Sequence, residues 1–340
     1  LDVIEVIKSQ VIIANDVKRV EKTSDVVKAI VSGDTVVFVN GSNSALVIST
    51  KGWPSRSIIE PDTEKALRGP REGFTEGIMV NLSLIRRKIQ TNELKFEFRS
   101  FGTKSNTKAC ICYIDNLIDK EILNELNRRL DKIDIDGILD SNYIAEMIKD
   151  APMSPFKTIG ITERPDTVAS KLLEGRIALV VDGSPVVLTL PYLFIENFQS
   201  NDDYYLNFYF ASIGRLLRLF GFLVSISIPA IYVALTTYHR EMIPTYLSLS
   251  IIEAHKNVPF PTIVECILML LVFEIIRETG IRMPSNIGQA LSVVGALVIG
   301  QAAVEAKFIS APMVIIVSIT AITGIINPKI KGVKILTRLI

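Results

Sequence analysis

The chain has 340 residues, of which 49% are hydrophobic and 21% are charged, and its formal net charge is +1. A balance this close to neutral gives no indication of a nucleic-acid partner, and we expect none. The three cysteines and two histidines argue against a disulfide framework and against a metal site, and we expect no cofactor. Most of the charge lies before about residue 210, whereas the remainder is strongly apolar.

Two segments of the N-terminal part resemble each other. Gly33–Ser42 reads GDTVVFVNGS and Gly175–Ser184 reads GRIALVVDGS, at an offset of 175 − 33 = 142 residues. Each follows a helix-like run and precedes an apolar strand, and the Asn-Gly and Asp-Gly pairs favour tight turns with positive φ. A chance likeness between two short hairpins is the alternative interpretation. We predict two related α/β subdomains, residues 1–90 with a connecting helix and residues 91–200. The second copy begins with a strand and a helix that have no counterpart before the first copy. We therefore expect the first subdomain to be truncated at its N-terminus.

An irregular loop and a helix separate the two copies. The loop has a glycine on each side of a proline and consists of Gly69, Pro70, Arg71, Glu72 and Gly73. It lacks the GxxxxGK[ST] pattern of a phosphate-binding loop. The apolar spacing of the residues that follow predicts a helix. Arg86 and Arg87 on this helix are suited to an acidic partner or to lipid headgroups, and a solvated helix face is the alternative.

Acidic side chains of the α/β part do not form a catalytic pattern. Asp182 occupies a turn, and Asp166 is placed as a helix N-cap. Neither histidine lies in this part, so a nucleophile–histidine arrangement is absent. We predict that the chain has no catalytic residues and is not an enzyme. A pocket for a small ligand at the strand ends stays open as an alternative.

The C-terminal part has the composition of a helical membrane domain, which we place at residues 201–340. It contains four apolar stretches, at residues 213–238, 262–276, 287–304 and 311–327. At a rise of about 1.5 Å per residue, stretches of this kind approach the ~30 Å thickness of a hydrocarbon core. A buried helix of a soluble protein can imitate one such stretch but not four in succession. Lys and Arg are more numerous on the N-terminal side of these spans, which predicts a multi-pass protein with a cytoplasmic α/β part.

The third apolar stretch carries the candidate ion pathway. Ser292, Ala296 and Gly300 recur every four residues, and a strip of small side chains lets a second helix pack closely. Polar groups within lipid need a protein or water partner. The candidate pathway consists of Gln289, Ser292, Val298, Gln301 and Glu305. Simple hydrogen bonding of the glutamines to neighbouring helices is the alternative interpretation.

The order of several longer motifs resembles the A subunit of GerA-type nutrient germinant receptors of bacterial spores. The motifs are GPREGFTE, Leu84–Arg87, Ser154–Phe156, Thr162–Asp166, Leu173–Arg176, Ile228–Ala234, Val258–Pro261 and Val294–Gly300. The resemblance covers nearly the whole chain. It implies an α/β cytoplasmic region of two subdomains followed by an all-α transmembrane domain in the spore inner membrane.

The same resemblance implies the partners and the function. The partners would be a transporter-like B subunit that binds the nutrient and a lipoprotein C subunit. The A subunit would form a homo-oligomeric cation channel whose opening starts germination. Two alternatives stay open: a non-conducting scaffold that relays a signal, and a related paralogue that acts with the dipicolinate channel. Members of this family normally extend beyond both ends of this chain.

Overall fold

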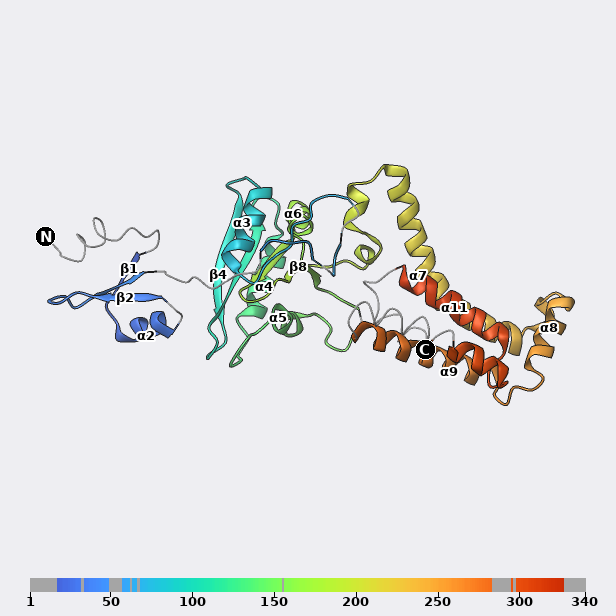
Figure 1. The fold of residues 1–340 in the computed structure, drawn as a ribbon. Coiled ribbons are helices and arrows are strands. Elements are labelled where there is room, and N and C mark those ends of the chain that lie inside the picture. The colour runs from blue at the N-terminus through green and yellow to red at the C-terminus, as the bar shows by residue number, and fades with distance from the viewer. Residues whose placement is uncertain are drawn as a thin grey trace. The chain divides into compact units, whose positions relative to one another are not determined.

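The structure is a computed structural model that describes residues 17–31, 34–48, 57–61, 63–65, 68–154, 156–282, 295 and 298–326 (Figure 1). It contains two compact units, Leu1–Ser57 and Ile58–Ile340. The connecting helix that we assigned to residues 1–90 therefore lies in the second unit. The division into residues 1–90, 91–200 and 201–340 stays a proposal.

The described residues of the first unit form a three-stranded antiparallel sheet with one helix. Its elements are β1 (Val17–Val20), α2 (Thr23–Val31), β2 (Thr35–Phe38) and β3 (Ala45–Ile48). The strand order is β1-β3-β2. Leu46 of β3 is fully buried, and Val26 and Ala29 give α2 its buried face. The β2–β3 turn contains Gly41 at φ 84°, as the Asn-Gly pair predicts.

The second unit begins with a larger antiparallel sheet of order β4-β5-β7-β8-β6. Its strands are β4 (Leu94–Phe101), β5 (Thr107–Ile114), β6 (Gly160–Thr162), β7 (Ile177–Val181) and β8 (Val187–Leu190). Apolar side chains on one face pack against α3 (Ile78–Lys88) and α6 (Pro165–Leu173). Those on the other face pack against α4 (Lys120–Leu130) and α5 (Ser141–Ile148). Because β7 is buried on both faces, its residues form a continuous apolar run.

The two sheets share one pairing register. Lys18 of β1 pairs with Val47 of β3, and Gly160 of β6 pairs with Thr189 of β8. The residue numbers of the second pair exceed those of the first by the same amount, since 160 − 18 = 142 and 189 − 47 = 142. The β2–β3 and β7–β8 pairs keep this offset throughout. The prediction of two α/β sheets is therefore confirmed, and the shared strand order and register support the interpretation that they are related.

The described residues that follow this sheet are mainly helical. Its elements are η2 (Phe194–Phe198), η3 (Asn201–Tyr204), α7 (Phe208–Thr237), η4 (Arg240–Met242), α8 (Thr245–His255), α9 (Thr262–Arg282) and α11 (Ala311–Ile325). Helices α7, α9 and α11 share an apolar cluster that contains Tyr232, Leu270 and Met313. A helical C-terminal part is thus confirmed, whereas an all-α transmembrane domain is a finer claim that these contacts leave as a proposal.

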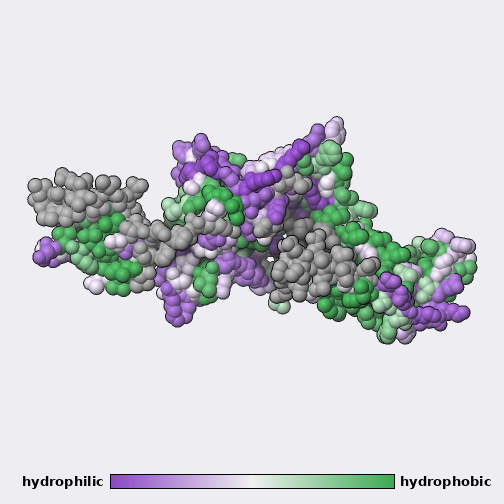
Figure 2. Space-filling view, viewed as in Figure 1, coloured by the Kyte–Doolittle hydropathy of each residue, from purple (hydrophilic) through white to green (hydrophobic). Residues whose placement is uncertain are grey.

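One helix of the described chain, α7 with 30 residues, is both long and apolar enough to cross a membrane. Many of its apolar side chains point outward, and Figure 2 shows apolar residues gathered over the helical part. The expected span 213–238 falls on α7, and α11 is a shorter apolar helix over most of 311–327. The span 262–276 is only the first part of α9, which continues through charged residues to Arg282. Most of 287–304 lies outside the described residues.

Candidate functional site

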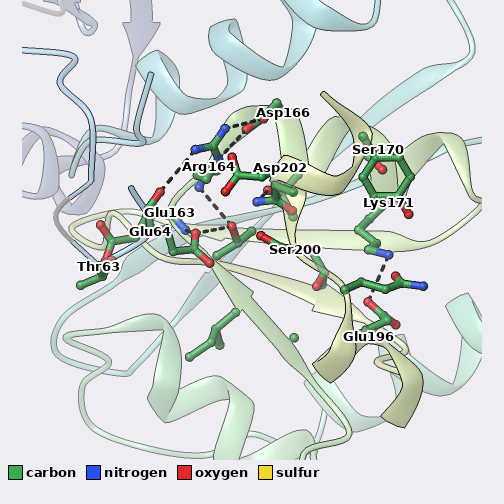
Figure 3. Close-up of a pocket in the computed structure, with 18 of the residues that line it drawn as sticks. Thr63, Glu64, Glu163, Arg164, Asp166, Ser170, Lys171, Glu196, Ser200 and Asp202 are labelled. Atoms are coloured by element: carbon green, nitrogen blue, oxygen red, sulfur yellow. Dashed lines mark hydrogen bonds and ion pairs between the residues drawn. The ribbon is translucent and has the colours of Figure 1, made fainter. Parts of the chain in front are cut away.

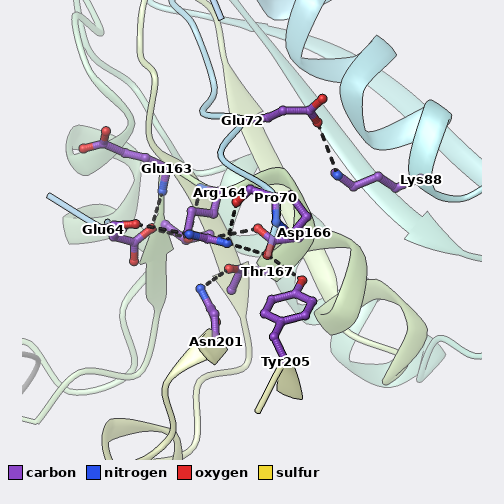
Figure 4. Close-up of polar contacts among 11 residues, drawn as sticks. Glu64, Pro70, Glu72, Lys88, Glu163, Arg164, Asp166, Thr167, Asn201 and Tyr205 are labelled. Atoms are coloured by element: carbon purple, nitrogen blue, oxygen red, sulfur yellow. Dashed lines mark hydrogen bonds and ion pairs between the residues drawn. The ribbon is translucent and has the colours of Figure 1, made fainter. Parts of the chain in front are cut away.

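A buried arginine at the start of α6 organises the candidate site. Pro165 occupies the first turn of α6, where its fixed φ and missing N–H suit a helix start. Arg164 immediately before it has a side chain only 2% exposed, and the Asp166 side chain is 8% exposed. The guanidinium donates from Nε to Asp166 Oδ1 at 3.1 Å and from Nη2 to Oδ2 at 2.7 Å (Figure 4). This two-bond geometry fits a planar guanidinium to a carboxylate.

The same guanidinium holds the glycine-rich loop. It donates from Nη2 to the carbonyl oxygen of Pro70 at 3.0 Å and from Nη1 to that of Glu64 at 3.3 Å. Gly69 adopts φ +104°, and a Cβ at this position would lie 2.7 Å from Cδ2 of Tyr205. Only glycine therefore lets the loop adopt this backbone and contact the Tyr205 ring.

Residues 191–207, here called the connector, join β8 to α7 and are bound to α6 by side chains. The Tyr205 hydroxyl donates to Asp166 Oδ2 at 2.7 Å, and Asn201 Nδ2 donates to Thr167 Oγ1 at 2.5 Å. Glu196, which is 5% exposed, forms ion pairs with Lys171 at 3.1 Å and with Arg176. Three points along the connector are thus bonded to α6 or to the residues that follow it.

The connector is also bonded to α7. The Asp203 side chain is 1% exposed and accepts from Arg218 Nη1 at 2.7 Å and Nη2 at 2.8 Å. Arg215 Nε adds a third bond at 3.1 Å, and Arg218 also donates to the Phe198 carbonyl at 3.0 Å. A buried carboxylate needs partners of this kind, because an unpaired one is costly.

The pKa shifts agree with these contacts. Burial raises the pKa of Asp166, but hydrogen bonds from Arg164 and Tyr205 outweigh it, and the pKa lies below its usual value. The pKa of Asp203 is shifted in the same way. Burial raises this pKa, but hydrogen bonds from Arg218, the Ser200 amide and Arg215 outweigh burial and bring it below the usual value. Burial and the bond to Asp166 raise the pKa of Tyr205 to about 12. At neutral pH both carboxyl groups are therefore ionised and Tyr205 keeps its donating proton.

A cavity of about 780 Å³ lies between β6, α6, residues 63–65 and the connector (Figure 3). Its size is that of a small-molecule site. The lining contains acids and bases, but Arg164 is paired with Asp166 and Lys171 with Glu196. Lys157 also lines it, and burial lowers the pKa of its ammonium. The described residues contain no group of three or more His, Cys, Asp or Glu side chains that could hold a metal ion.

The predicted loop and helix residues make contacts within the chain. Among Gly69, Pro70, Arg71, Glu72 and Gly73, the first two contact Tyr205 and Arg164 as described above. Glu72 pairs with Arg87 and, at 3.3 Å, with Lys88. Arg86 donates to the carbonyls of Thr91 at 2.6 Å and Leu94 at 2.9 Å. Arg86 therefore ties α3 to β4, while the Arg87 side chain is 56% exposed.

The predicted pathway residues are only partly described. Gln289, Ser292 and Ala296 lie outside the described residues. Gln301 Nε2 donates to Glu305 Oε1 at 2.9 Å on an exposed helix face, and Val298 is 57% exposed. A Cβ on Gly300 would lie 3.8 Å from Val314 Cγ1, so this glycine faces α11.

Sequence reasoning missed the residues at the centre of the site. Asp166, expected as an N-cap, lies in the first turn of α6, and the N-cap position belongs to Arg164. Arg164 entered only as part of the motif Thr162–Asp166, Tyr205 only as one of several aromatic residues before the first apolar stretch, and Asp203 was not singled out. The available signals were a charged pair on both sides of Pro165 and an aromatic run directly before α7, and neither identifies a partner.

A model of the Bacillus/Clostridium GerA spore germination protein family matches residues 2–340. The chain belongs to this GerA family. The chain is 49% identical over 296 residues to spore germination protein KA of Bacillus subtilis (strain 168), covering 87% of this chain and 54% of that protein. It is 41% identical over 298 residues to spore germination protein GerLA of Bacillus cereus, covering 88% and 61%. This GerA-family chain thus spans between half and two thirds of the length of these curated relatives.

A solved structure also matches. It is the crystal structure of the N-terminal domain of the A subunit of the Bacillus megaterium spore germinant receptor GerK3, with 45% identity and a TM-score of 0.30. The match covers 36% of this GerA-family chain and 97% of that one. The family is one of germination proteins and not of enzymes, which agrees with the prediction that this chain is not an enzyme.

Proposed function

We propose that this chain is the A subunit of a nutrient germinant receptor and that it passes a signal from its α/β part to its helical part through the connector. The observation that supports this proposal is that the connector is bonded both to α6 and to α7. Tyr205 and Glu196 bind it to α6 and to Arg176, and Asp203 binds it to α7.

The receptor lies in the spore inner membrane with its α/β part in the cytoplasm. Family membership and the apolar surface of α7 support this placement. Between Leu219 and Thr237 the helix has no charged residue, and these 19 residues extend about 28 Å, close to a hydrocarbon core. Arg215 and Arg218, held by Asp203, mark the polar boundary of this span. A multi-pass arrangement uses α9, α11 and residues 287–304 as the further spans.

The receptor works with a transporter-like B subunit and a lipoprotein C subunit, and several copies of the A subunit line a cation channel. Gln301 and Glu305 support this part of the proposal, because a bonded polar pair on an exposed helix face needs a polar environment within a membrane. The competing proposal is a non-conducting scaffold that relays the signal. The same exposed pair favours the channel over the scaffold.

Cation flux separates the channel from the scaffold. The full-length protein, alone and with its B and C partners, is reconstituted into lipid vesicles, and flux is compared with that of Gln301→Leu. A channel loses or changes its conductance on this substitution while its assembly persists. Absence of cation permeability in every combination, or a variant that affects assembly alone, contradicts the channel.

The relay is tested in the complete receptor. Asp203→Asn removes the charge that holds Arg215 and Arg218, and we expect a reduced nutrient response with normal assembly. Glu241→Gln, an exposed change in η4, is the matched control and leaves the response intact. A normal response in Asp203→Asn contradicts the relay and does not affect the assignment as a receptor subunit.

A further inference from the structure

A second polar cluster lies inside the helical part, away from the connector. Glu265 of α9 is fully buried within the apolar cluster shared by α7, α9 and α11. Its Oε1 accepts the backbone N–H of Ser310, the residue before α11. Its Oε2 lies 3.3 Å from Nε2 of His255, the last residue of α8. Glu265 therefore touches the ends of two other helices.

The histidine ring has a defined orientation. Its Nδ1 lies 2.9 Å from the carbonyl oxygen of Ile251. A carbonyl only accepts hydrogen bonds, so Nδ1 carries a hydrogen. Nε2 of the neutral ring is then an acceptor that faces Glu265 Oε2, which is an acceptor as well. Two acceptors 3.3 Å apart repel each other unless a proton lies on one of them.

Because the Glu265 carboxylate is buried, loss of this proton is costly. With one proton, the pair is either imidazolium with carboxylate or imidazole with carboxylic acid, and its total charge is zero in both forms. Without the proton, the cluster holds a net negative charge in an apolar setting, which is costly. The hydroxyls of Tyr232 and Ser310 lie nearby, and neither has a well-formed hydrogen bond among the described residues.

The other titratable groups near the pair are few among the described residues. Tyr232 of α7 interacts electrostatically with Glu265, and the buried Cys266 is the next residue of α9. From α8, Glu253 and Lys256 are exposed, and Lys307 in the turn before α11 is exposed too. Ser310, the residue before α11, is uncharged. None of these supplies a buried cation, so a proton is the charge that the site lacks.

We propose that His255 and Glu265 form a proton-binding site that fastens α8 and the start of α11 to α9. One proton is shared between His255 Nε2 and Glu265 Oε2, and it exchanges with water along the His255 side chain, which is 20% exposed. A rise in pH removes this proton, leaves two facing acceptors and loosens α8. The site acts independently of the connector and does not depend on the proposed relay.

The shared proton is detected by ¹⁵N NMR on the full chain in lipid nanodiscs. The chain has two histidines, so His239→Gln leaves His255 as the one imidazole. In this background we expect Nε2 to carry or share a proton at neutral pH. Adding Glu265→Gln removes the carboxylate, and Nε2 then shows the resonance of a ring nitrogen without its own proton. An unprotonated Nε2 in the His239→Gln chain, or no change on Glu265→Gln, overturns the proposal.

The fastening of α8 is detected by hydrogen exchange, corrected for the intrinsic effect of pH. One linked proton changes an opening equilibrium by at most about tenfold per pH unit. We expect α8 amides of the unaltered chain to open more as pH rises, with a slope approaching this limit. Both Glu265→Gln and His255→Gln remove the slope, whereas the exposed Glu253→Gln keeps it. A slope that survives in Glu265→Gln and in His255→Gln refutes the site.

Discussion

Replacing Arg164 by methionine tests whether the buried guanidinium holds the α/β part together. Methionine is similar in length but has no charge and no donor. The substitution removes both bonds to Asp166 and leaves the carbonyl oxygens of Pro70 and Glu64 without this donor. Asp166 keeps the Tyr205 hydroxyl as a side-chain partner.

The expected cost follows from burial. The side chains of the pair are 2% and 8% exposed, so solvent screens the loss very little. Removal of one partner of a buried ion pair costs about 3–5 kcal/mol, because the other charge stays buried. An unfolding entropy of about 2.1 cal/mol/K per residue gives roughly 0.7 kcal/mol/K for 340 residues, so each kcal/mol lowers the melting temperature by about 1.4 °C and we expect a decrease of at least about 4 °C.

Thermal unfolding of the full chain in detergent measures this effect against two comparison variants. Arg128→Met is the matched control, because Arg128 pairs with Glu125 on an exposed face of α4 and its side chain is 57% exposed. We expect a change within about 0.5 kcal/mol for this control. The double variant Arg164→Met/Asp166→Asn also removes the stranded charge, and it should recover a large part of the loss.

The reasoning is refuted by either of two results. One is a decrease for Arg164→Met no larger than that for Arg128→Met. The other is a double variant less stable than Arg164→Met, since the carboxylate would then contribute without its arginine.

Three further predictions concern the loop and the connector. Gly69→Ala should lower the free energy of unfolding by about 1–3 kcal/mol, because φ +104° is strained for alanine and its Cβ meets Tyr205. The control is Gly77→Ala, where a Cβ finds ordinary contacts. Equal melting temperatures of the two variants would contradict the geometry. Tyr205→Phe should lower the free energy of unfolding by about 1 kcal/mol through loss of its bond to Asp166, and by less once Asp166→Asn is present. A calorimetric double-mutant cycle measures this difference. Additive effects of the two substitutions would exclude the bond. The pKa of Asp203 lies below that of an unfolded aspartate, about 3.9, so its contribution is present above that pH and is lost as pH falls through the folded pKa; acid unfolding of Asp203→Asn should lack this part of the pH dependence.

Local patterns predicted the two hairpins and the helix after the glycine-rich loop, because alternation, helical spacing and turn residues act over a few neighbours. Gly41 and Gly183 both adopt φ 84°, as the repeated Asn-Gly and Asp-Gly turns indicate. The 142-residue offset even anticipates the pairing register. The apolar run of 262–276 was a poorer guide, since α9 continues through charged residues that keep helical propensity.

The site itself could not be predicted because its partners are distant in sequence. Arg164 reaches carbonyls 94 and 100 residues away, and Tyr205 reaches Asp166 over 39 residues. The burial that makes Arg164 important arises only when the loop, α6 and the connector pack together. Among the described residues of the predicted pathway, the Gln301–Glu305 spacing of four residues translates directly into a contact on one helix.

The central claim is that the connector couples α6 to α7. A double-mutant cycle between Asp166→Asn, which acts on α6, and Asp203→Asn, which acts on α7, measures that coupling in the unfolding of the full chain. Independent sites add within about 0.5 kcal/mol, whereas linked sites deviate by more. We predict a coupling energy of about 1 kcal/mol or above, carried by the connector residues between the two carboxylates. Additivity within 0.5 kcal/mol would contradict the account.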